Sequence, residues 1–216
     1  MPTAFISVSH KAKRLGALAR LLDEKAWWIM ATEGTAHYIQ RHASVRSIPV
    51  ETMTGFPPLF GGRVKTLHPK IFGGVLAKES HRAQADKHHI QLIDLVVADF
   101  YPFLETVQSG ASEADCVDRI DIGGPALVLA AAKNHDRVTV LVDPADYQQV
   151  IDEISAHGST HPATRARLAF KAEEHVIRYQ LTVHHWRKSR NGAPLDPTPE
   201  DPFKDLYAGG KLAKKF

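Results

Sequence analysis

The chain has 216 residues, of which 44% are hydrophobic and 24% charged, and its formal charge at pH 7 is +3. That charge is too small to indicate nucleic-acid binding, and no apolar run approaches the ~20 residues of a membrane span or resembles the core of a signal peptide. The only cysteine, Cys116, excludes an internal disulfide and fits a reducing compartment. We therefore expect a cytoplasmic globular protein that binds neither nucleic acid nor membrane.

Apolar runs rich in β-formers alternate with helical patterns over residues 4–156. Strands are expected at 4–8, 27–31, 45–50, 93–98 and 137–142, and residues 71–77 are apolar enough for a strand or a tightly packed turn. Helical patterns are expected at 15–22, 35–39 and 112–119, in the Ala/Leu-rich run that ends at Lys133, and after Asp143-Pro144. This alternation predicts an α/β fold with a mainly parallel sheet flanked by helices.

Two further segments follow the alternating part. Apolar residues every three or four positions over 160–188 predict a long helix that packs on the sheet domain or on a second subunit. Residues 191–216 are proline-rich and then basic, with too little apolar surface to fold alone. We therefore expect one domain over residues 1–190, including the C-terminal helix, and a tail over 191–216.

The most distinctive stretch runs from Gly61 to Gly74, with glycine pairs at both ends. Arg63, Lys65 and Lys70 lie between the pairs, together with a threonine and a histidine. Glycines let the backbone approach a ligand closely, and the cations suit a phosphate or a developing oxyanion. The alternative is a solvated basic turn. A ligand site is favoured because two further punctuated polar stretches, 99–103 and 121–133, also fall between apolar runs.

Parallel sheets bind ligands outside the carboxyl ends of their strands. His10-Lys11, Thr32 to Thr35 and Asp99 to Tyr101 fall at those ends. A strand, a short Gly/Thr turn and a helix around Thr32 can direct N–H groups at a phosphate, or Thr32 or Thr35 can be a plain N-cap.

The 13 histidines do not indicate a metal site. The pairs His88-His89 and His184-His185 are adjacent, so on a helix their side chains diverge by about 100° and do not chelate from one face. No metal-ligand spacing is present. We expect no metal.

Several motifs resemble one known family. GGRVKTLHPK (61–70), DIGG (121–124), AAAKNH (130–135) and DPADY (143–147) are similar to the IMP cyclohydrolase domain of the bifunctional purine-biosynthesis enzyme. Gly55-Phe56-Pro57 and Tyr101-Pro102-Phe103 match it too, and the likeness runs in register from about Ile6 to about Tyr179. The resemblance implies a methylglyoxal-synthase-like α/β domain, usually a homodimer, that closes the ring of FAICAR to give IMP and water without a cofactor. A folate-dependent transformylase domain follows in that enzyme, and we expect this chain to supply the cyclohydrolase half alone.

The resemblance also implies roles for individual residues. Lys65 and Lys133 would flank the reacting groups as cations, Asp121 would pair with one of them and move a proton, and Tyr101 would bond near the formyl oxygen. Arg63 and Thr66 would position the base and carboxamide. The full set of implied substrate-binding residues is Ser7, Ser9, Lys11, Thr32, Gly34, Thr35, Arg63, Thr66, Asp99, Gly123 and Gly124. Apart from the resemblance, Asp121 and Lys133 could equally form a buried ion pair that ties a helix to a loop.

The chain departs from the family pattern mainly where the phosphate and ribose are expected. The differing residues are His10, Ala12 and Lys13 after the first strand, Ala31 and Glu33 in the loop Ala31 to Thr35 after the second, Asp99 for an asparagine, Pro58 for a glutamate, Phe72 for a histidine, and Leu129 for an arginine. Glu33 is the sharpest case, because a carboxylate beside a phosphate opposes binding. Either Lys13 and His10 offset Glu33, or its side chain points to solvent.

Three hypotheses remain. The first is a free-standing IMP cyclohydrolase acting on FAICAR. The second is a divergent cyclase that acts on a modified formamido-carboxamide ribotide or nucleoside in a specialised pathway, favoured by the loss of the phosphate-loop pattern. The third is a non-catalytic nucleotide sensor, disfavoured because a sensor has no use for Lys65, Tyr101, Asp121 and Lys133 together.

Overall fold

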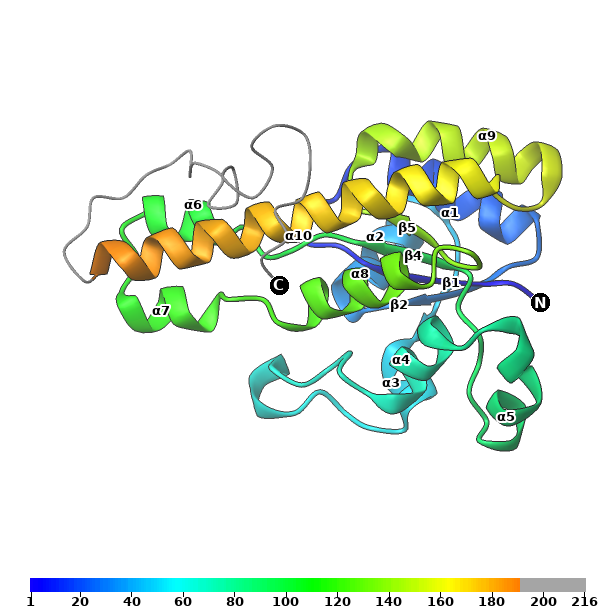
Figure 1. Cartoon of the computed structure of the whole chain (residues 1–216), viewed down its shortest axis with the longest axis horizontal. Helices are drawn as coiled ribbons and strands as arrows, with labels where there is room; N and C mark the ends of the chain where they lie inside the picture. Colours follow the sequence, from blue (N-terminus) through cyan, green and yellow to red (C-terminus); the bar gives the residue numbers. More distant parts are fainter. Residues whose placement is uncertain (191–216) are drawn as a thin grey trace, which may run out of the picture.

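A five-stranded, all-parallel sheet lies at the centre of the molecule, in the order β3-β2-β1-β4-β5 (Figure 1). The computed structural model describes residues 1–190. Its strands are β1 (Thr3–Ser7), β2 (Trp28–Ala31), β3 (Ile48–Pro49), β4 (Leu95–Ala98) and β5 (Thr139–Leu141). The predicted α/β class with a parallel sheet is confirmed.

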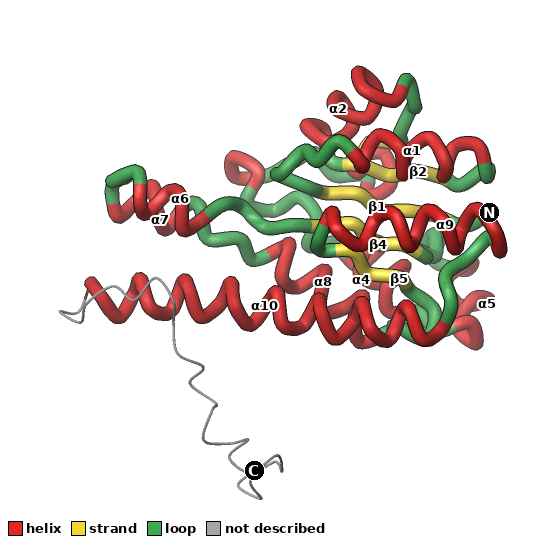
Figure 2. Tube along the Cα trace, turned by 90° about the horizontal axis from the view of Figure 1, so that it is seen from above, coloured by secondary structure: helices red, strands yellow, loops and turns green. Residues whose placement is uncertain are grey.

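Helices cover both faces of the sheet (Figure 2). One face packs against α1 (Arg14–Glu24), α2 (Glu33–Ala43) and α9 (Tyr147–His157). The other face packs against α3 (Val50–Thr54), α4 (Pro69–Leu76), α8 (Gly123–Lys133) and α10 (Pro162–Arg190). The shorter helices are α5 (Arg82–Lys87), α6 (Phe103–Gln108) and α7 (Glu113–Asp118), with 3₁₀ turns at Phe60–Gly62, Glu79–His81 and Pro144–Asp146. Of the helices within residues 1–190, none has the length and apolar character needed to cross a bilayer.

Alternation along β1 explains the two apolar layers. Ala4 and Ile6 point to the α1 side and Phe5 to the α8 side, and all three are fully buried. A parallel strand covered on both faces needs apolar residues in both directions. Burying one large side chain in this way contributes about 1.5–3 kcal/mol.

A small separate core lies beyond the sheet. Phe103, Cys116, Val183 and Trp186 form it, joining α6 and α7 to the C-terminal part of α10. The rings of Phe103 and Trp186 meet edge to face at 5.3 Å. Figure 1 shows α10 running past α8 toward α6 and α7. The predicted long helix therefore packs on the domain and also holds two short helices.

Two local predictions were wrong. Residues 71–77 are not a strand, because α4 begins at Pro69 and His68 caps it by accepting from the Lys70 N–H at 3.1 Å. The third strand is only Ile48–Pro49, an edge strand that ends where α3 begins. Pro49 has no N–H to donate, which limits the pairing of this strand. The predicted tail at 191–216 lies outside the described residues.

Gly74 provides a test of how closely α4 packs on the sheet domain. A Cβ at this position would lie 2.3 Å from the Gln91 carbonyl oxygen, so we expect Gly74→Ala to force a backbone shift. The cost should be about 1–3 kcal/mol or more, measured by urea unfolding. The control is Gly34→Ala, where nothing lies within 4 Å. Equal stability of both variants would contradict the packing.

Candidate active site

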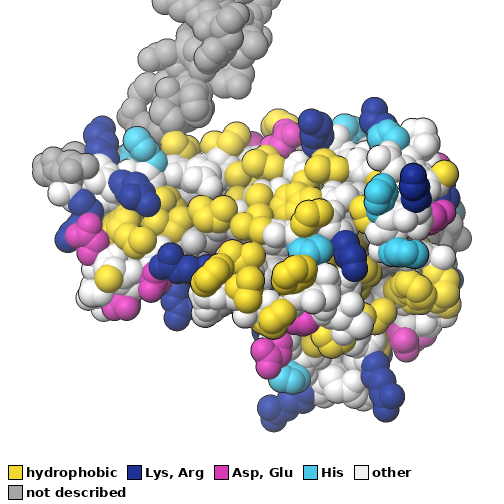
Figure 3. Space-filling model, turned by 90° about the horizontal axis from the view of Figure 1, so that it is seen from below, with side chains coloured by type: hydrophobic (Ala, Val, Ile, Leu, Met, Phe, Trp, Pro, Cys, Tyr) yellow, Lys and Arg dark blue, Asp and Glu magenta, His cyan; other side chains and the backbone are white. Residues whose placement is uncertain are grey.

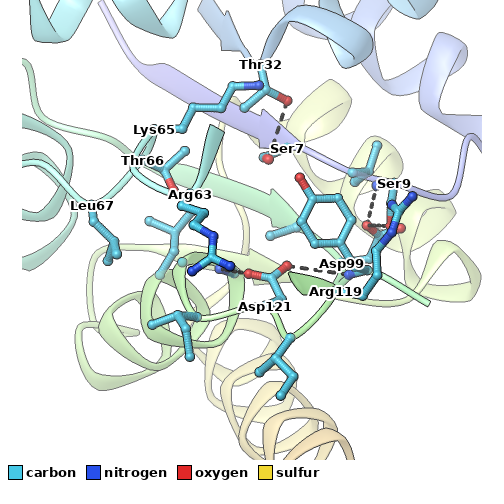
Figure 4. Close-up of a pocket in the computed structure, with 18 of the residues that line it drawn as sticks. Ser7, Ser9, Thr32, Arg63, Lys65, Thr66, Leu67, Asp99, Arg119 and Asp121 are labelled. Carbon is cyan, nitrogen blue, oxygen red and sulfur yellow. Dashed lines mark hydrogen bonds between the residues drawn. The ribbon is translucent and has the colours of Figure 1, made fainter. Parts of the chain in front are cut away.

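A cavity of about 720 Å³ opens at the carboxyl ends of β1, β2 and β4 (Figure 4). Segments far apart in the sequence line it, including the 61–67 loop, the segment after β4 and the start of α8. Of the residues predicted from the sequence, all but Lys133 line this cavity: Ser7, Ser9, Lys11, Thr32, Gly34, Thr35, Arg63, Lys65, Thr66, Asp99, Tyr101, Asp121, Gly123 and Gly124. The expected convergence of loops thus exists within a single chain.

Hydroxyl groups gather where β1 and β2 end. Thr32 occupies the N-cap position of α2 without a capping bond from its side chain, and its Oγ1 lies 3.4 Å from Ser7 Oγ and 3.3 Å from Thr35 Oγ1. Lys11 Nζ is 3.3 Å from Thr35 Oγ1 and donates to the Val8 carbonyl. Hydroxyls and a cation at a helix N-terminus form an environment suited to phosphate.

Two lysines lie near this cluster of three hydroxyls. Figure 4 shows Lys65 extending from the 61–67 loop toward Thr32. Burial lowers the pKa of Lys11, the Asp99 carboxylate opposes that shift, and the positive charge of Lys65 adds to it. The effect of Lys65 on Lys11 means that both cations act on the same end of the cavity.

Glu33 does not face the cavity. It is the first residue of α2, its side chain is exposed, and it is absent from the cavity lining. At this position its charge is favourable toward the helix dipole. The expected repulsion between Glu33 and a phosphate is therefore weakened by its position outside the cavity.

Asp99 joins β4 to the loop after β1. Its Oδ1 accepts from the Ser9 N–H and from Ser9 Oγ at 2.9 Å, and its Oδ2 accepts from the His10 N–H at 2.8 Å. Hydrogen bonds to a carboxylate are stronger than neutral ones. The loop that carries Lys11 is therefore fixed to the end of the neighbouring strand.

Asp121 lies in the loop before α8, where its carboxylate accepts from the Gly124 N–H at 2.8 Å and the Tyr101 N–H at 3.4 Å. Burial raises the pKa of the Asp121 carboxyl, these two hydrogen bonds oppose the shift, and Asp99 adds to it. A Cβ on Gly124 would lie 2.8 Å from the Asp121 carboxylate, so this close approach requires glycine. A half-buried carboxyl with a raised pKa is suited to moving a proton.

The 61–67 loop closes over the start of α8. Phe60 and Gly61 both have positive φ, and Leu59 and Val64 form an antiparallel bridge around them. A Cβ on Gly123 would lie 3.0 Å from Thr66 Oγ1, which shows how closely the two segments approach.

Arg63 reaches from this loop to α7, where it forms a salt bridge with Asp118. Both side chains are more than half exposed and line the cavity.

Lys133 lies away from this cavity. It is the last residue of α8, whereas Gly123 is the first, and at about 1.5 Å per residue the two are roughly 15 Å apart. Its side chain is exposed and does not line the cavity. Within residues 1–190 Asp121 forms no salt bridge with a lysine. The single chain therefore brings Lys65, Tyr101 and Asp121 together without Lys133.

Sequence reasoning missed three charged residues of the cavity: Asp118, Arg119 and Arg187. The first two fall at the end of the helix expected at 112–119 and belong to no motif. Arg187 is near the end of α10, and only the three-dimensional path of that helix brings it to the cavity.

A second cavity of about 700 Å³ shares Asp99 and Tyr101 with the first. It lies against α10, and the ring of His175 packs on Phe100 at 4.7 Å. Burial lowers the pKa of His175, and the carboxylates of Asp99 and Asp143 oppose the shift. Among the described residues no cluster of histidine, cysteine, aspartate and glutamate could hold a metal ion in either place.

Comparison with known proteins gives consistent matches along the chain. Residues 14–126 match the model of the MGS-like domain, and residues 131–207 match that of the AICARFT/IMPCHase bienzyme. The bifunctional purine biosynthesis protein PurH of Streptococcus pneumoniae serotype 2 (strain D39 / NCTC 7466) is 46% identical over 191 residues, 87% of this chain and 37% of that protein. PurH of Prochlorococcus marinus (strain MIT 9301) is 42% identical over 194 residues, with 88% and 37% covered.

A solved structure of ForH is also similar. It aligns with a TM-score of 0.72 and 34% identity, covering 85% of this chain and 96% of the ForH chain. The chain thus spans nearly all of the ForH chain but only 37% of the PurH proteins. The chain belongs to the family of MGS-like domains and corresponds to the IMP cyclohydrolase portion of bifunctional PurH.

Proposed function

We propose that this chain catalyses an IMP-cyclohydrolase-type ring closure, converting FAICAR to IMP and water. One observation carries the proposal: Lys65, Tyr101 and Asp121 come from three distant segments and line one cavity. The relation to PurH supports a role in purine biosynthesis.

The reaction needs little from the protein beyond geometry and charge. The carboxamide nitrogen attacks the formamide carbon of the same molecule, forming the new C–N bond and leaving oxyanion character on the former formyl oxygen. That oxygen then leaves as water with one hydrogen from each of the two nitrogens, so no redox step or co-reactant is involved. Because the attack is intramolecular, holding the two groups in contact supplies much of the rate.

The proposed roles follow from where each group lies. Lys65 supplies positive charge to the developing oxyanion, and Tyr101 donates a hydrogen bond near the formyl oxygen. Asp121 takes a proton from nitrogen, which its raised pKa favours. Arg63 and Thr66 position the base and carboxamide from the 61–67 loop.

The position of the departing residues favours FAICAR over a modified substrate. Of the residues that differ from the family pattern, Ala12, Lys13, Glu33, Phe72 and Leu129 do not line the cavity, whereas Asp99 does. The alternative, a cyclase for a modified formamido-carboxamide ribotide or nucleoside, is supported by Asp99, which departs from the family pattern and lines the cavity. Turnover of FAICAR and of its dephosphorylated nucleoside, followed by purine absorbance, separates the two. Preferred turnover of FAICAR is the expected result, equal or better turnover of the nucleoside supports the alternative, and tight nucleotide binding without turnover indicates a sensor.

A homodimer and a cytoplasmic location stay predictions. Large exposed apolar side chains include Phe56, Phe60, Ile122, Leu129 and Phe170. Figure 3 shows hydrophobic side chains gathered on the face of the molecule seen from below. Such surface supports a homodimer, because soluble monomers rarely leave large apolar patches exposed.

Lys65→Ala tests the charge that faces the reacting groups. We expect turnover of FAICAR to fall by about 10²- to 10³-fold, the usual cost of removing one transition-state donor. The melting temperature should change little, because Lys65 lies on a surface loop. The matched control is Lys87→Ala, an exposed lysine of α5 away from the cavity, which should retain turnover. A large drop in melting temperature for Lys65→Ala would show that the lysine is structural.

Lys133→Ala tests whether Lys133 contributes to turnover, as the resemblance implies, or does not, as its position outside the cavity implies. Because Lys133 lies outside the cavity, we expect it to affect turnover far less than Lys65→Ala does. The measurement is kcat and KM for FAICAR with both variants. An equal loss in kcat would contradict a site formed by one chain.

Asp121→Asn should separate activity from stability. Asparagine still accepts from Gly124 but takes no proton, so turnover should fall by about 10²- to 10⁴-fold. The folded-state pKa of Asp121 is raised above 3.8, so its ionisation disfavours folding as pH rises through that pKa. The stability of Asp121→Asn relative to wild type should therefore increase from acid to neutral pH, measured by urea unfolding. A difference that does not vary with pH would contradict the raised pKa of Asp121, because it would mean that the hydrogen bonds to the carboxylate cancel the effect of burial.

A further inference from the structure

The cavity has a surplus of positive charge. Five basic side chains line it, namely Lys11, Arg63, Lys65, Arg119 and Arg187, against the three acidic ones Asp99, Asp118 and Asp121. Asp99 is bonded to N–H groups of the loop after β1, and Asp118 is paired with Arg63. Burial disfavours the charged form of Asp121. The Arg63–Asp118 pair removes one charge of each sign, so five basic against three acidic side chains leave a surplus of two positive charges.

Lys11 and Lys65 are the basic residues at the sheet end of the cavity. Arg119 and Arg187 come from other elements: Arg119 follows α7 directly, and Arg187 belongs to the last turns of α10. Figure 4 shows Arg63 and Arg119 reaching toward the cavity on either side of Asp121. No motif or resemblance assigned a role to Arg119 or Arg187.

The small core fixes these two arginines. Cys116, three residues before Arg119, packs with Trp186, which directly precedes Arg187. Arg190 also bonds to Glu113 at 2.7 Å, which ties the end of α10 to the start of α7. The packing between α7 and the end of α10 thus holds Arg119 and Arg187 on a fixed support beside the cavity.

We propose that Arg119 and Arg187 form a second anion subsite at the rim of the cavity, which draws in a phosphate-bearing ligand and strengthens its binding. Both guanidinium groups stay charged, and positive charge at the rim attracts the oxygens of a phosphate. Both side chains are exposed, so part of their effect acts at a distance during association and is screened by salt. The choice of a nucleotide as ligand rests on the proposed function.

The test compares binding of IMP and inosine by isothermal titration calorimetry, using the full chain as wild type, Arg119→Ala, Arg187→Ala and Arg187→Lys. The matched control is Lys188→Ala, the exposed neighbour of Arg187 that does not line the cavity. Each alanine variant should weaken IMP binding about tenfold at low salt, because it removes one positive charge that attracts the phosphate. Inosine binding should be unchanged, Arg187→Lys should restore most of the loss, and high salt should reduce the difference between wild type and variants.

Three results would overturn the subsite: equal losses for IMP and inosine, a loss no greater than that of Lys188→Ala, or wild-type binding of IMP no tighter than that of inosine. Melting temperatures of all variants identify any that fail to fold, and Arg187→Lys keeps the test decisive in that case. These readouts involve no turnover. Salt-sensitive IMP binding without FAICAR turnover would therefore refute the proposed reaction alone, and turnover with unaffected IMP binding in the variants would refute the subsite alone.

Discussion

The site depends on the parallel pairing of β1 with β4, which sets Ser7 opposite Ala98. In the order β3-β2-β1-β4-β5 the chain leaves β1 toward one edge of the sheet and leaves β4 toward the other. The loops after these two strands therefore diverge and leave a crevice between them, where ligands bind in sheets of this type. The Asp99 carboxylate closes the base of that crevice by accepting hydrogen bonds from the N–H groups of Ser9 and His10.

The 61–67 loop and the start of α8 complete the cavity, because their backbones approach each other closely. Glycine at 123 and 124 lets α8 begin close to the 61–67 loop and the Asp121 carboxylate, since a Cβ would lie 3.0 Å from Thr66 Oγ1 at the first position and 2.8 Å from Asp121 at the second. The Asp121 carboxylate is bonded to backbone N–H groups and partly buried, so it is held in place while its proton affinity is increased. The same geometry thus orders the loop and prepares a group for proton transfer.

Much of this could be predicted from the sequence because the signals were local. Apolar runs gave the strands at β1, β2, β4 and β5, and the glycine-bracketed motif and DIGG identified loops that do line the cavity. Residues 69–76 were missed because an apolar run with glycines does not distinguish a buried helix from a strand, although the His68-Pro69 start was present.

The sequence could not show which residues far apart along the chain lie close together or far apart in space. Lys133 and Asp121 belong to the same stretch of sequence, but the length of α8 separates them in space. Arg187 is far from every motif, yet packing of Trp186 brings it to the rim. Both outcomes depend on the paths of α8 and α10, which are set by tertiary packing and not by local pattern.

A crystal structure of this chain with IMP bound would test the proposed site most directly. We expect the purine ring in the first cavity between Lys65 and Asp121, with Tyr101 against it. IMP bound in the second cavity beside His175, or at a site that excludes Lys65 and Asp121, would contradict the proposed site.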